Sequence, residues 1–147
     1  MVDRLEIQKA TIKEISLILE LYRQIDNEDI IAIEEANKIF KKFQKYPNYS
    51  LYVAKFQNKI IGTFELLIMD NLAHKGKPSG VVEDVVVDSA YRSMGIGKKM
   101  MKFAMDICRK NDCYKLTLSS NIHRDRAHDF YERIGFKKHG YSFLIDL

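Results

Sequence analysis

Val81-Val82-Glu83-Asp84-Val85-Val86-Val87 is a valine-rich run, and it is followed by the glycine-rich turn Arg92-Ser93-Met94-Gly95-Ile96-Gly97. The first run predicts a strand, and the residues after the turn, 98–110, have the periodicity of a helix. Two glycines let the backbone approach a bulky anion closely, and the amides after them are the unpaired donors of a helix N-terminus. We therefore expect this strand-turn-helix unit to bind a phosphate or pyrophosphate group.

Two common phosphate-binding motifs do not fit this turn. A dinucleotide fingerprint requires a third glycine three positions after Gly97, where the chain has Met100. A Walker-type loop requires a glycine at the position of Arg92 and a Ser or Thr at that of Lys99. The pattern Arg-x-x-Gly-x-Gly after a valine-rich strand instead resembles the acetyl-coenzyme A signature of the GNAT superfamily of N-acetyltransferases. A glycine-rich turn without a ligand is the structural alternative.

The length and composition predict one globular domain, residues 1–147. Hydrophobic residues make up 46% of the chain and charged residues 30%, which is ordinary for a soluble protein. No segment is apolar enough over the length of a membrane span, and the stretch 1–6 lacks the pattern of a signal peptide. We therefore expect a cytoplasmic protein that binds no membrane.

Cysteine, histidine and net charge limit the classes of ligand. Cys108 and Cys113 do not have the spacing of a redox or zinc motif, so both are expected to be reduced. The net charge of +4 is spread among acidic residues, so it does not indicate nucleic-acid binding and suits an anionic coenzyme. No metal-binding spacing is found among the histidines, which are His74, His123, His128 and His139.

The periodicity of the remaining chain predicts the element order β-α-α-β-β-β-α-β-α-β. Strands are expected at 4–9, 51–56, 60–69, 81–87 and 114–119, with closing strands around Phe136 and Phe143. Helices are expected after a capping box at 11–14 and at 31–46, 98–110 and 124–134, and a hairpin turn at 57–59. This α/β (α+β) order, with a mixed and mostly antiparallel sheet flanked by helices, is similar to the GNAT fold.

A second motif lies near the end of the chain, where Phe130-Tyr131-Glu132 precedes Gly135-Phe136. It resembles the carboxyl-terminal pattern of GNAT enzymes. The resemblance implies direct transfer of an acetyl group from acetyl-coenzyme A, as co-substrate, to a primary amine of a small molecule. In that scheme Tyr131 is the general acid that protonates the departing sulfur. The alternative for Tyr131 is a core aromatic that anchors the last helix.

Glu83 and Asp84 interrupt the valine-rich strand. They are similar to the Glu-Asp pair of polyamine and amino-sugar acetyltransferases in this superfamily, which implies that Glu83 is the general base and that Asp84 contacts the substrate or a neighbouring strand. Many members carry the acidic base two positions earlier, where this chain has Val81. Because side chains alternate along a strand, only one of the two carboxylates is expected on each side of the sheet. An ion pair with a lysine is the structural alternative for Glu83.

The resemblance also implies the residues that hold the coenzyme. The backbone of Val85, Val86 and Val87 would pair with pantetheine as an added strand does. Asn121 would hydrogen-bond the same arm, although an asparagine after a strand is equally well a turn residue. The pyrophosphate would bind at Arg92, Met94, Gly95, Ile96, Gly97 and Lys98.

The sequence determines the acceptor of the acetyl group less well than it determines the donor. The run 118–131 resembles aminoalkylphosphonate and aminoglycoside acetyltransferases, and a phosphonate would suit Arg124, Arg126 or the loop 75–77. A polyamine would suit the acidic residues of the helical region, which are Glu28, Asp29, Glu34 and Glu35. The alternatives are a protein or peptide N-acetyltransferase and a non-catalytic acyl-coenzyme A-binding module. The closing strands, 137–146, are similar to those that pair across dimers, so a homodimer is expected.

Overall fold

The computed structural model describes residues 4–25 and 31–147. Glu28 and Asp29, two of the acidic residues that would suit a polyamine, lie outside the described residues. The chain forms two compact units, Met1–Thr117 and Leu118–Leu147.

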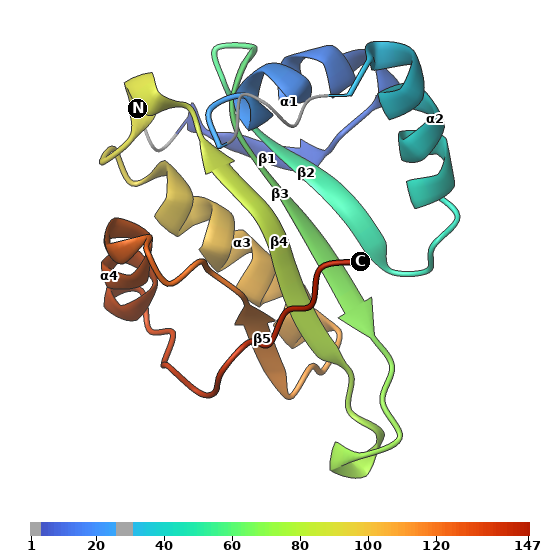
Figure 1. Cartoon of the computed structure of the whole chain (residues 1–147), viewed down its shortest axis with the longest axis vertical. Coiled ribbons are helices and arrows are strands. Elements are labelled where there is room, and N and C mark those ends of the chain that lie inside the picture. Colours follow the sequence, from blue (N-terminus) through green and yellow to red (C-terminus); the bar gives the residue numbers. More distant parts are fainter. Residues whose placement is uncertain (1–3, 26–30) are drawn as a thin grey trace. The chain divides into compact units, whose positions relative to one another are not determined.

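The sheet has the strand order β1-β2-β3-β4-β5 (Figure 1). The first four strands pair antiparallel with their neighbours. Beside β4, the amide of Tyr114 donates to the carbonyl of Pro78 and the Thr117 hydroxyl to that of Gly80. Tyr114 precedes Thr117 in the chain just as Pro78 precedes Gly80, so β5 runs parallel to β4. The strands are β1 Glu6–Lys9, β2 Tyr49–Phe56, β3 Lys59–Met69, β4 Ser79–Val87 and β5 Lys115–Leu118.

The turn between β2 and β3 confirms the predicted hairpin. Gln57 and Asn58 have positive φ angles of 49° and 63°. Two central residues with positive φ form the turn whose twist matches that of the flanking antiparallel strands. The long hairpin places β3 in the interior of the sheet, where nearly all of its residues are buried.

Helices α1 (Ile15–Tyr22) and α2 (Ile33–Phe43) are those predicted between the first two strands. The short 3-10 helix η2 (Ile12–Glu14) precedes α1, and the amide of Thr11 donates to Glu14 Oε2 over 2.6 Å, as the predicted capping box requires. Apolar residues of α1 and α2 form one core with residues of β2, β3 and β4. Its fully buried members include Ile18 and Val53.

Helix α3 (Ile96–Lys110) packs against β3 and β4 on the opposite face of the sheet from α1. A Cβ added to Gly62 would lie 2.7 Å from Met100 Sδ, and one added to Gly80 would lie 2.4 Å from Cys108 Sγ. Such distances leave no room for a side chain at either glycine. Helix α3 therefore lies close against β3 and β4 at both glycines.

The unit 118–147 contains α4 (Asp125–Arg133), which confirms the predicted last helix. The predicted closing strands around Phe136 and Phe143 are wrong for this structure, because residues 136–147 form no strand. The alternation of apolar residues in this segment fits a strand, but a strand requires a neighbour to pair with. The apolar side chains are instead exposed, namely Tyr141, Phe143, Leu144, Ile145 and Leu147.

Candidate functional site

The predicted phosphate cradle lies between β4 and α3. The chain leaves β4 at Val87, forms the 3-10 helix η4 (Ser89–Tyr91) and enters α3 at Gly95, the N-cap residue. Gly95 has a φ of 81°, a left-handed conformation in which a side chain is strained. The Arg92 Nε donates to the carbonyl of Val87 over 3.2 Å, so this side chain ties the turn to the end of the strand.

The first amides of α3 are suited to an anion. The first bond within the helix runs from the amide of Lys99 to the carbonyl of Gly95 over 3.1 Å, so the amides of Ile96, Gly97 and Lys98 precede it. Gly95 provides no side chain to cap them. These amides and the positive end of the helix dipole fit a pyrophosphate group. The backbone at this turn therefore has groups that suit a pyrophosphate, such as that of coenzyme A.

Asp88 holds the entry to the turn. Its carboxylate accepts from the amide of Ala90 over 3.0 Å and pairs with Lys59 Nζ at 3.3 Å. Although burial opposes ionisation, these contacts lower the pKa of the Asp88 carboxyl. The amide of Ser89 donates to Gln24 Oε1 over 2.8 Å, which joins the turn to the end of α1. Contacts with Lys59 of β3 and with Gln24, which follows α1, thus anchor the entry to the turn.

The side chains of the predicted coenzyme-binding residues differ in their exposure to solvent. Arg92, Met94 and Lys98 are exposed, whereas the side chains of Ile96 and Val86 belong to the core. Ile96 and Val86 can therefore contribute only backbone groups. Strand β5 has only four residues and lies beside the first part of β4, near Pro78 and Gly80. The part of β4 formed by residues 85–87 extends beyond that pairing, as strand-like addition of pantetheine requires.

A β-bulge interrupts β4 next to Glu83. Thr63 pairs with Val86 and Glu65 with Glu83, so two residues of β4 oppose the single residue between Thr63 and Glu65. Asp84, in the bulge, has a φ of 47°. Both carboxylates act electrostatically on Glu65 and Tyr49. The bulge interrupts the regular alternation of side chains on which the expected separation of Glu83 and Asp84 rests.

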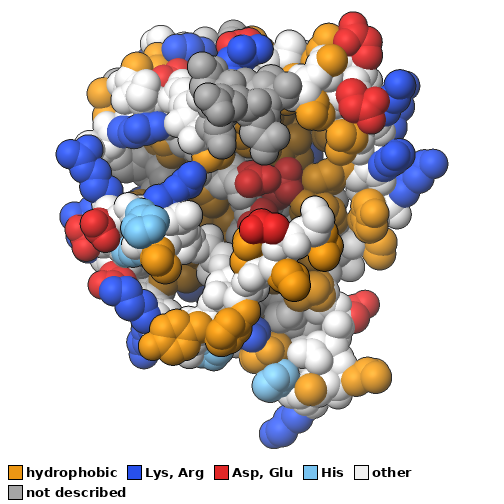
Figure 2. Space-filling model, in the orientation of Figure 1, with side chains coloured by type: hydrophobic (Ala, Val, Ile, Leu, Met, Phe, Trp, Pro, Cys, Tyr) orange, Lys and Arg blue, Asp and Glu red, His pale blue; other side chains and the backbone are white. Residues whose placement is uncertain are grey.

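Glu65 is a third carboxyl group at this bulge. Its side chain is buried, with 9% exposed, and accepts hydrogen bonds from the hydroxyls of Tyr22 of α1, over 3.4 Å, and Tyr49 of β2. Burial raises the pKa of Glu65, the hydrogen bonds lower it, and the charges of Asp84 and Glu83 raise it further. Partial burial and Asp84 also raise the pKa of Glu83. Figure 2 shows acidic side chains recessed over β3 and β4.

Glu65 is not among the site residues that were predicted from the sequence. The signal that could have found it is the one used for Glu83, a carboxylate inside an otherwise apolar strand, which here is 60–68. The ion-pair alternative for Glu83 has no support, because none of the ion pairs among the described residues contains Glu83.

Tyr131 and Asn121 lie in the second unit. The Tyr131 ring contacts Phe130 and Phe136 with centroid distances of 5.1 and 5.6 Å. Burial raises the pKa of the Tyr131 hydroxyl, although Arg124 opposes the shift, so the group is protonated at neutral pH. The Asn121 Oδ1 accepts from the amide of His123 over 2.9 Å, as in a turn. Its side-chain nitrogen is the group that remains a candidate for pantetheine.

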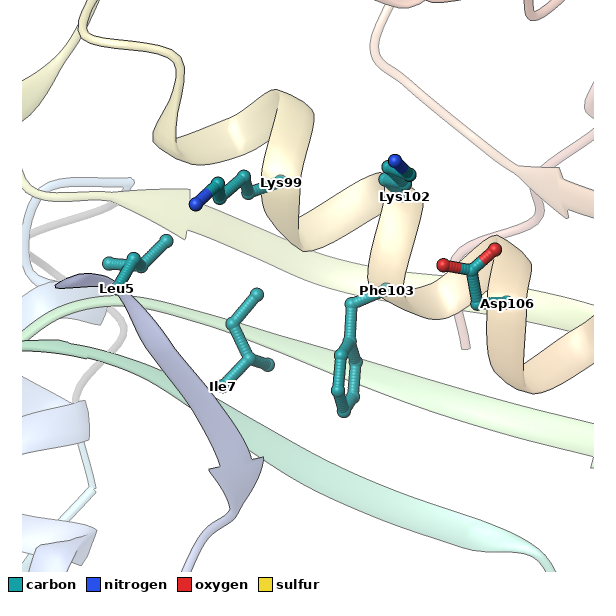
Figure 3. A pocket seen from close by; sticks show the side chains of 6 residues that line it. All are labelled: Leu5, Ile7, Lys99, Lys102, Phe103 and Asp106. Carbon is teal, nitrogen blue, oxygen red and sulfur yellow. The ribbon is translucent and has the colours of Figure 1, made fainter. Parts of the chain in front are cut away.

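A shallow pocket of about 340 Å³ lies between β1 and α3 (Figure 3). Its apolar floor comes from both elements, and Lys99 and Lys102 lie at its rim; the other lining residues are Leu5, Ile7, Phe103 and Asp106. None of the predicted catalytic residues lines it. Elsewhere in the described ranges, no three side chains of His, Cys, Asp or Glu converge as metal ligands. None of the helices in these ranges has the length and apolarity to span a membrane.

Comparison with protein families gives a match over residues 16–136 to the model of the acetyltransferase (GNAT) family. A solved structure assigned as an acetyltransferase from Agrobacterium tumefaciens str. C58 superposes with a TM-score of 0.91 and 29% identity, and the alignment covers 97% of this chain and 99% of that one. This likeness confirms the predicted fold class.

The curated relatives include enzymes that act on an amino sugar. Glucosamine 6-phosphate N-acetyltransferase of Trypanosoma brucei brucei is 36% identical over 89 residues, which cover 60% of this chain and 58% of that protein. The enzyme of the same name from Arabidopsis thaliana is 29% identical over 80% of this chain and 78% of its own length. The solved structure of the Arabidopsis enzyme covers 97% of each chain with a TM-score of 0.85 and 27% identity. Aminoalkylphosphonate N-acetyltransferase of Salmonella typhimurium is 29% identical over 66% of this chain and 62% of its own.

Proposed function

Since the chain belongs to the acetyltransferase (GNAT) family, as its motifs predict, we propose that it transfers an acetyl group from acetyl-coenzyme A to the primary amine of glucosamine 6-phosphate. The prediction of an N-acetyltransferase is confirmed at the level of the family. The observation that carries the proposal for the donor is the cradle at the start of α3. The support for the acceptor comes from the two curated relatives that act on this amino sugar.

The cradle and the end of β4 supply the coenzyme contacts in this proposal. The amides of Ile96, Gly97 and Lys98 hold the pyrophosphate, and Gly95 allows it to approach the backbone. Beyond the pairing with β5, the backbone groups of 85–87 hold the pantetheine arm. Bound acetyl-coenzyme A supplies the activated acetyl group as a thioester.

Glu83 takes the amine proton. An ammonium cannot attack, so one proton must leave before the new C–N bond forms. Glu83 is exposed at the bulge and has a raised pKa, which makes it a better proton acceptor than an ordinary glutamate. It acts through a water molecule. Asp84, beside it, attracts the ammonium form of the acceptor.

Tyr131 supplies the other proton. As the C–S bond breaks, the sulfur leaves with the electron pair and takes the phenolic proton, and the amine nitrogen keeps the acetyl group. The raised pKa keeps this hydroxyl protonated at neutral pH. Neither cysteine is needed as a nucleophile in this scheme. Burial and the neighbouring Cys113 thiol raise the pKa of the Cys108 thiol to about 12.

An aminoalkylphosphonate is the second candidate acceptor. The run 118–131 resembles enzymes of that class, and the Salmonella relative acts on such compounds. Both candidates combine a primary amine with a phosphorus oxyanion. The acceptor pocket is thus proposed to recognise an anion at one end and an amine at the other, with the amine toward Glu83 and Asp84.

The proposal also covers the cellular compartment, the oligomeric state and the rival functions. We propose a cytoplasmic homodimer, with the exposed apolar side chains of the segment 141–147 at the contact between copies. A non-catalytic coenzyme A-binding module and an enzyme for peptide amines are the rival functions, and the same assay separates them from a small-molecule enzyme.

The test is coenzyme A thiol release from acetyl-coenzyme A with a panel of acceptors. The panel contains glucosamine 6-phosphate, glucosamine, aminoalkylphosphonates, polyamines, aminoglycosides and short peptides. Glucose 6-phosphate, which lacks the amine, and heat-denatured protein are the controls. Release that requires both the amine and the phosphate of the sugar supports the proposal. Binding of coenzyme A without release to any acceptor supports the non-catalytic module, and release only with peptides supports the peptide enzyme.

A further inference from the structure

Asp88 is the residue at which the chain leaves β4 for the turn to α3, and it takes no part in the proposed proton transfers. Its side chain is only 13% exposed although it is charged. The carboxylate accepts from the amide of Ala90 over 3.0 Å, and the Asp88 carbonyl accepts from the amide of Tyr91 over 2.8 Å. Asp88 therefore holds the conformation of η4, the segment directly before the proposed pyrophosphate site at 92–98.

Strand β3 fastens this turn to the sheet. The amide of Asp88 donates to the carbonyl of Ile61 over 2.9 Å, and the carboxylate pairs with Lys59 Nζ at 3.3 Å. The same ammonium lies 5.0 Å from the centroid of the Tyr91 ring, within the range of a cation–π contact. Lys59 thus contacts η4 at both its N-cap residue and its last residue.

Gln24 fastens the turn from a different element, since it follows α1. Its Oε1 accepts from the amide of Ser89 over 2.8 Å, and this amide is one that a helix start leaves without a partner of its own. Burial alone would raise the pKa of the Asp88 carboxyl, but hydrogen bonds with Ala90, Lys59 and Gln24 lower it. The Gln24 side chain therefore contacts both Ser89 and Asp88, as an amide with an acceptor and two donor hydrogens can.

We propose that Gln24 and Asp88 are positioning residues for the coenzyme, because together they anchor the turn that leads to the pyrophosphate-binding amides of α3. The inference rests on the proposed function, in which residues 92–98 bind the pyrophosphate. Arg92 Nε donates to the carbonyl of Val87, so the turn closes on itself and a shift at Asp88 reaches Arg92. Loss of an anchor gives the site more conformational freedom, which the coenzyme must remove when it binds.

This role determines which part of the coenzyme is affected. The pyrophosphate binds after the turn, whereas the pantetheine arm is proposed to pair with residues 85–87, which lie in the sheet before Asp88. Loosening of the turn therefore weakens the binding of ligands that contain the pyrophosphate and spares pantetheine. A residue needed only for folding would affect both classes of ligand equally.

The experiment measures the Kd of coenzyme A and of dephospho-coenzyme A, which keeps the pyrophosphate, by isothermal titration calorimetry. Pantetheine binding is measured by NMR chemical-shift titration. We expect the Kd of both coenzymes to rise about threefold in Gln24→Ala and about tenfold in Asp88→Ala, because one and several hydrogen bonds are lost. Asp88→Asn keeps an acceptor for the Ala90 amide and recovers part of the loss. Gln44→Ala, at an exposed glutamine at the end of α2, is the matched control.

A wild-type Kd for coenzyme A in Gln24→Ala overturns the inference, and so does an equal loss of affinity for pantetheine. Gln24 is exposed, so this variant decides the question even if Asp88→Ala does not fold. In the transferase assay, kcat at saturating acetyl-coenzyme A stays at the wild-type value in Gln24→Ala while KM for acetyl-coenzyme A rises. A wild-type protein that does not bind coenzyme A would overturn the proposed function itself. A wild type that binds it, with unchanged affinity in Gln24→Ala, counts against this inference alone.

Discussion

The amide of Lys99 donates to the carbonyl of Gly95 over 3.1 Å, and this is the first hydrogen bond within α3. The relationship leaves the preceding amides directed out of the helix at the end of β4. Gly95 makes this possible because its φ of 81° turns the chain into the helix without a side chain in the way. The donor site of the proposed enzyme thus depends on one glycine.

Gly95→Val should weaken acetyl-coenzyme A binding by about tenfold or more, because a β-branched residue is strained at positive φ and its side chain obstructs the cradle. Isothermal titration calorimetry with coenzyme A measures the effect. Gly140→Val is the control, since a Cβ there meets nothing within 4 Å. Equal affinity of Gly95→Val and wild type would contradict the cradle.

Tyr131→Phe should lower kcat by about 10²-fold while coenzyme A binding is kept, because only the proton donor is removed. Single-turnover kinetics and calorimetry separate the two effects. Tyr141→Phe, which changes an exposed tyrosine, should leave kcat unchanged. A Tyr131→Phe enzyme with the wild-type kcat would leave Tyr131 with only its packing role against Phe130 and Phe136.

Glu83→Gln should lower kcat by about 10²-fold or more, because glutamine cannot accept the amine proton. In the wild type the base must be ionised, so kcat/KM should rise with pH, with its midpoint above the ordinary glutamate range because the pKa of Glu83 is raised. The pH profile of both proteins checks this. A wild-type midpoint at or below the ordinary range, or an unaffected kcat in Glu83→Gln, would exclude Glu83 as the base.

Asp84→Asn should mainly raise KM for the acceptor, because the variant loses a charge that attracts the ammonium. Asparagine is suited to this position, since it tolerates the left-handed φ of 47° that Asp84 adopts. The backbone bulge is therefore kept, and steady-state kinetics report the charge alone. A fall in kcat with unchanged KM would instead place Asp84 in the proton transfer.

Gly80→Ala should destabilise the fold by about 1–3 kcal/mol, because the new Cβ would lie 2.4 Å from Cys108 Sγ. Chemical denaturation measures the change in the free energy of unfolding. Adding Cys108→Ala removes the sulfur and should recover part of the loss in a double-mutant cycle. Strictly additive effects of the two substitutions would show that α3 does not pack on β4 in this way.

Much of this architecture could be predicted from the sequence because the signals are local. The Gln57-Asn58 turn, the Thr11 capping box and Gly95 before α3 each act through backbone conformation within a few residues. The closing strand could not be predicted correctly, because an alternating apolar segment becomes a strand only when it has a partner to pair with.

The sequence allowed most residues of the candidate site to be predicted, but it did not allow their arrangement in space to be predicted. Glu83 and Asp84 were identified by their chemistry, but the bulge that interrupts β4 beside β3 depends on pairing between distant segments. Glu65 needed the same long-range information. Its two hydrogen-bond donors, Tyr22 and Tyr49, and its register partner Glu83 come from three other elements.

The most direct measurement is identification of the product by mass spectrometry after incubation with glucosamine 6-phosphate and acetyl-coenzyme A labelled with carbon-13 in the acetyl group. The account predicts a labelled acetyl group on the sugar nitrogen, with one coenzyme A thiol released for each product formed. Unlabelled sugar, from a protein that is folded and binds coenzyme A, would contradict the proposed transfer to this acceptor.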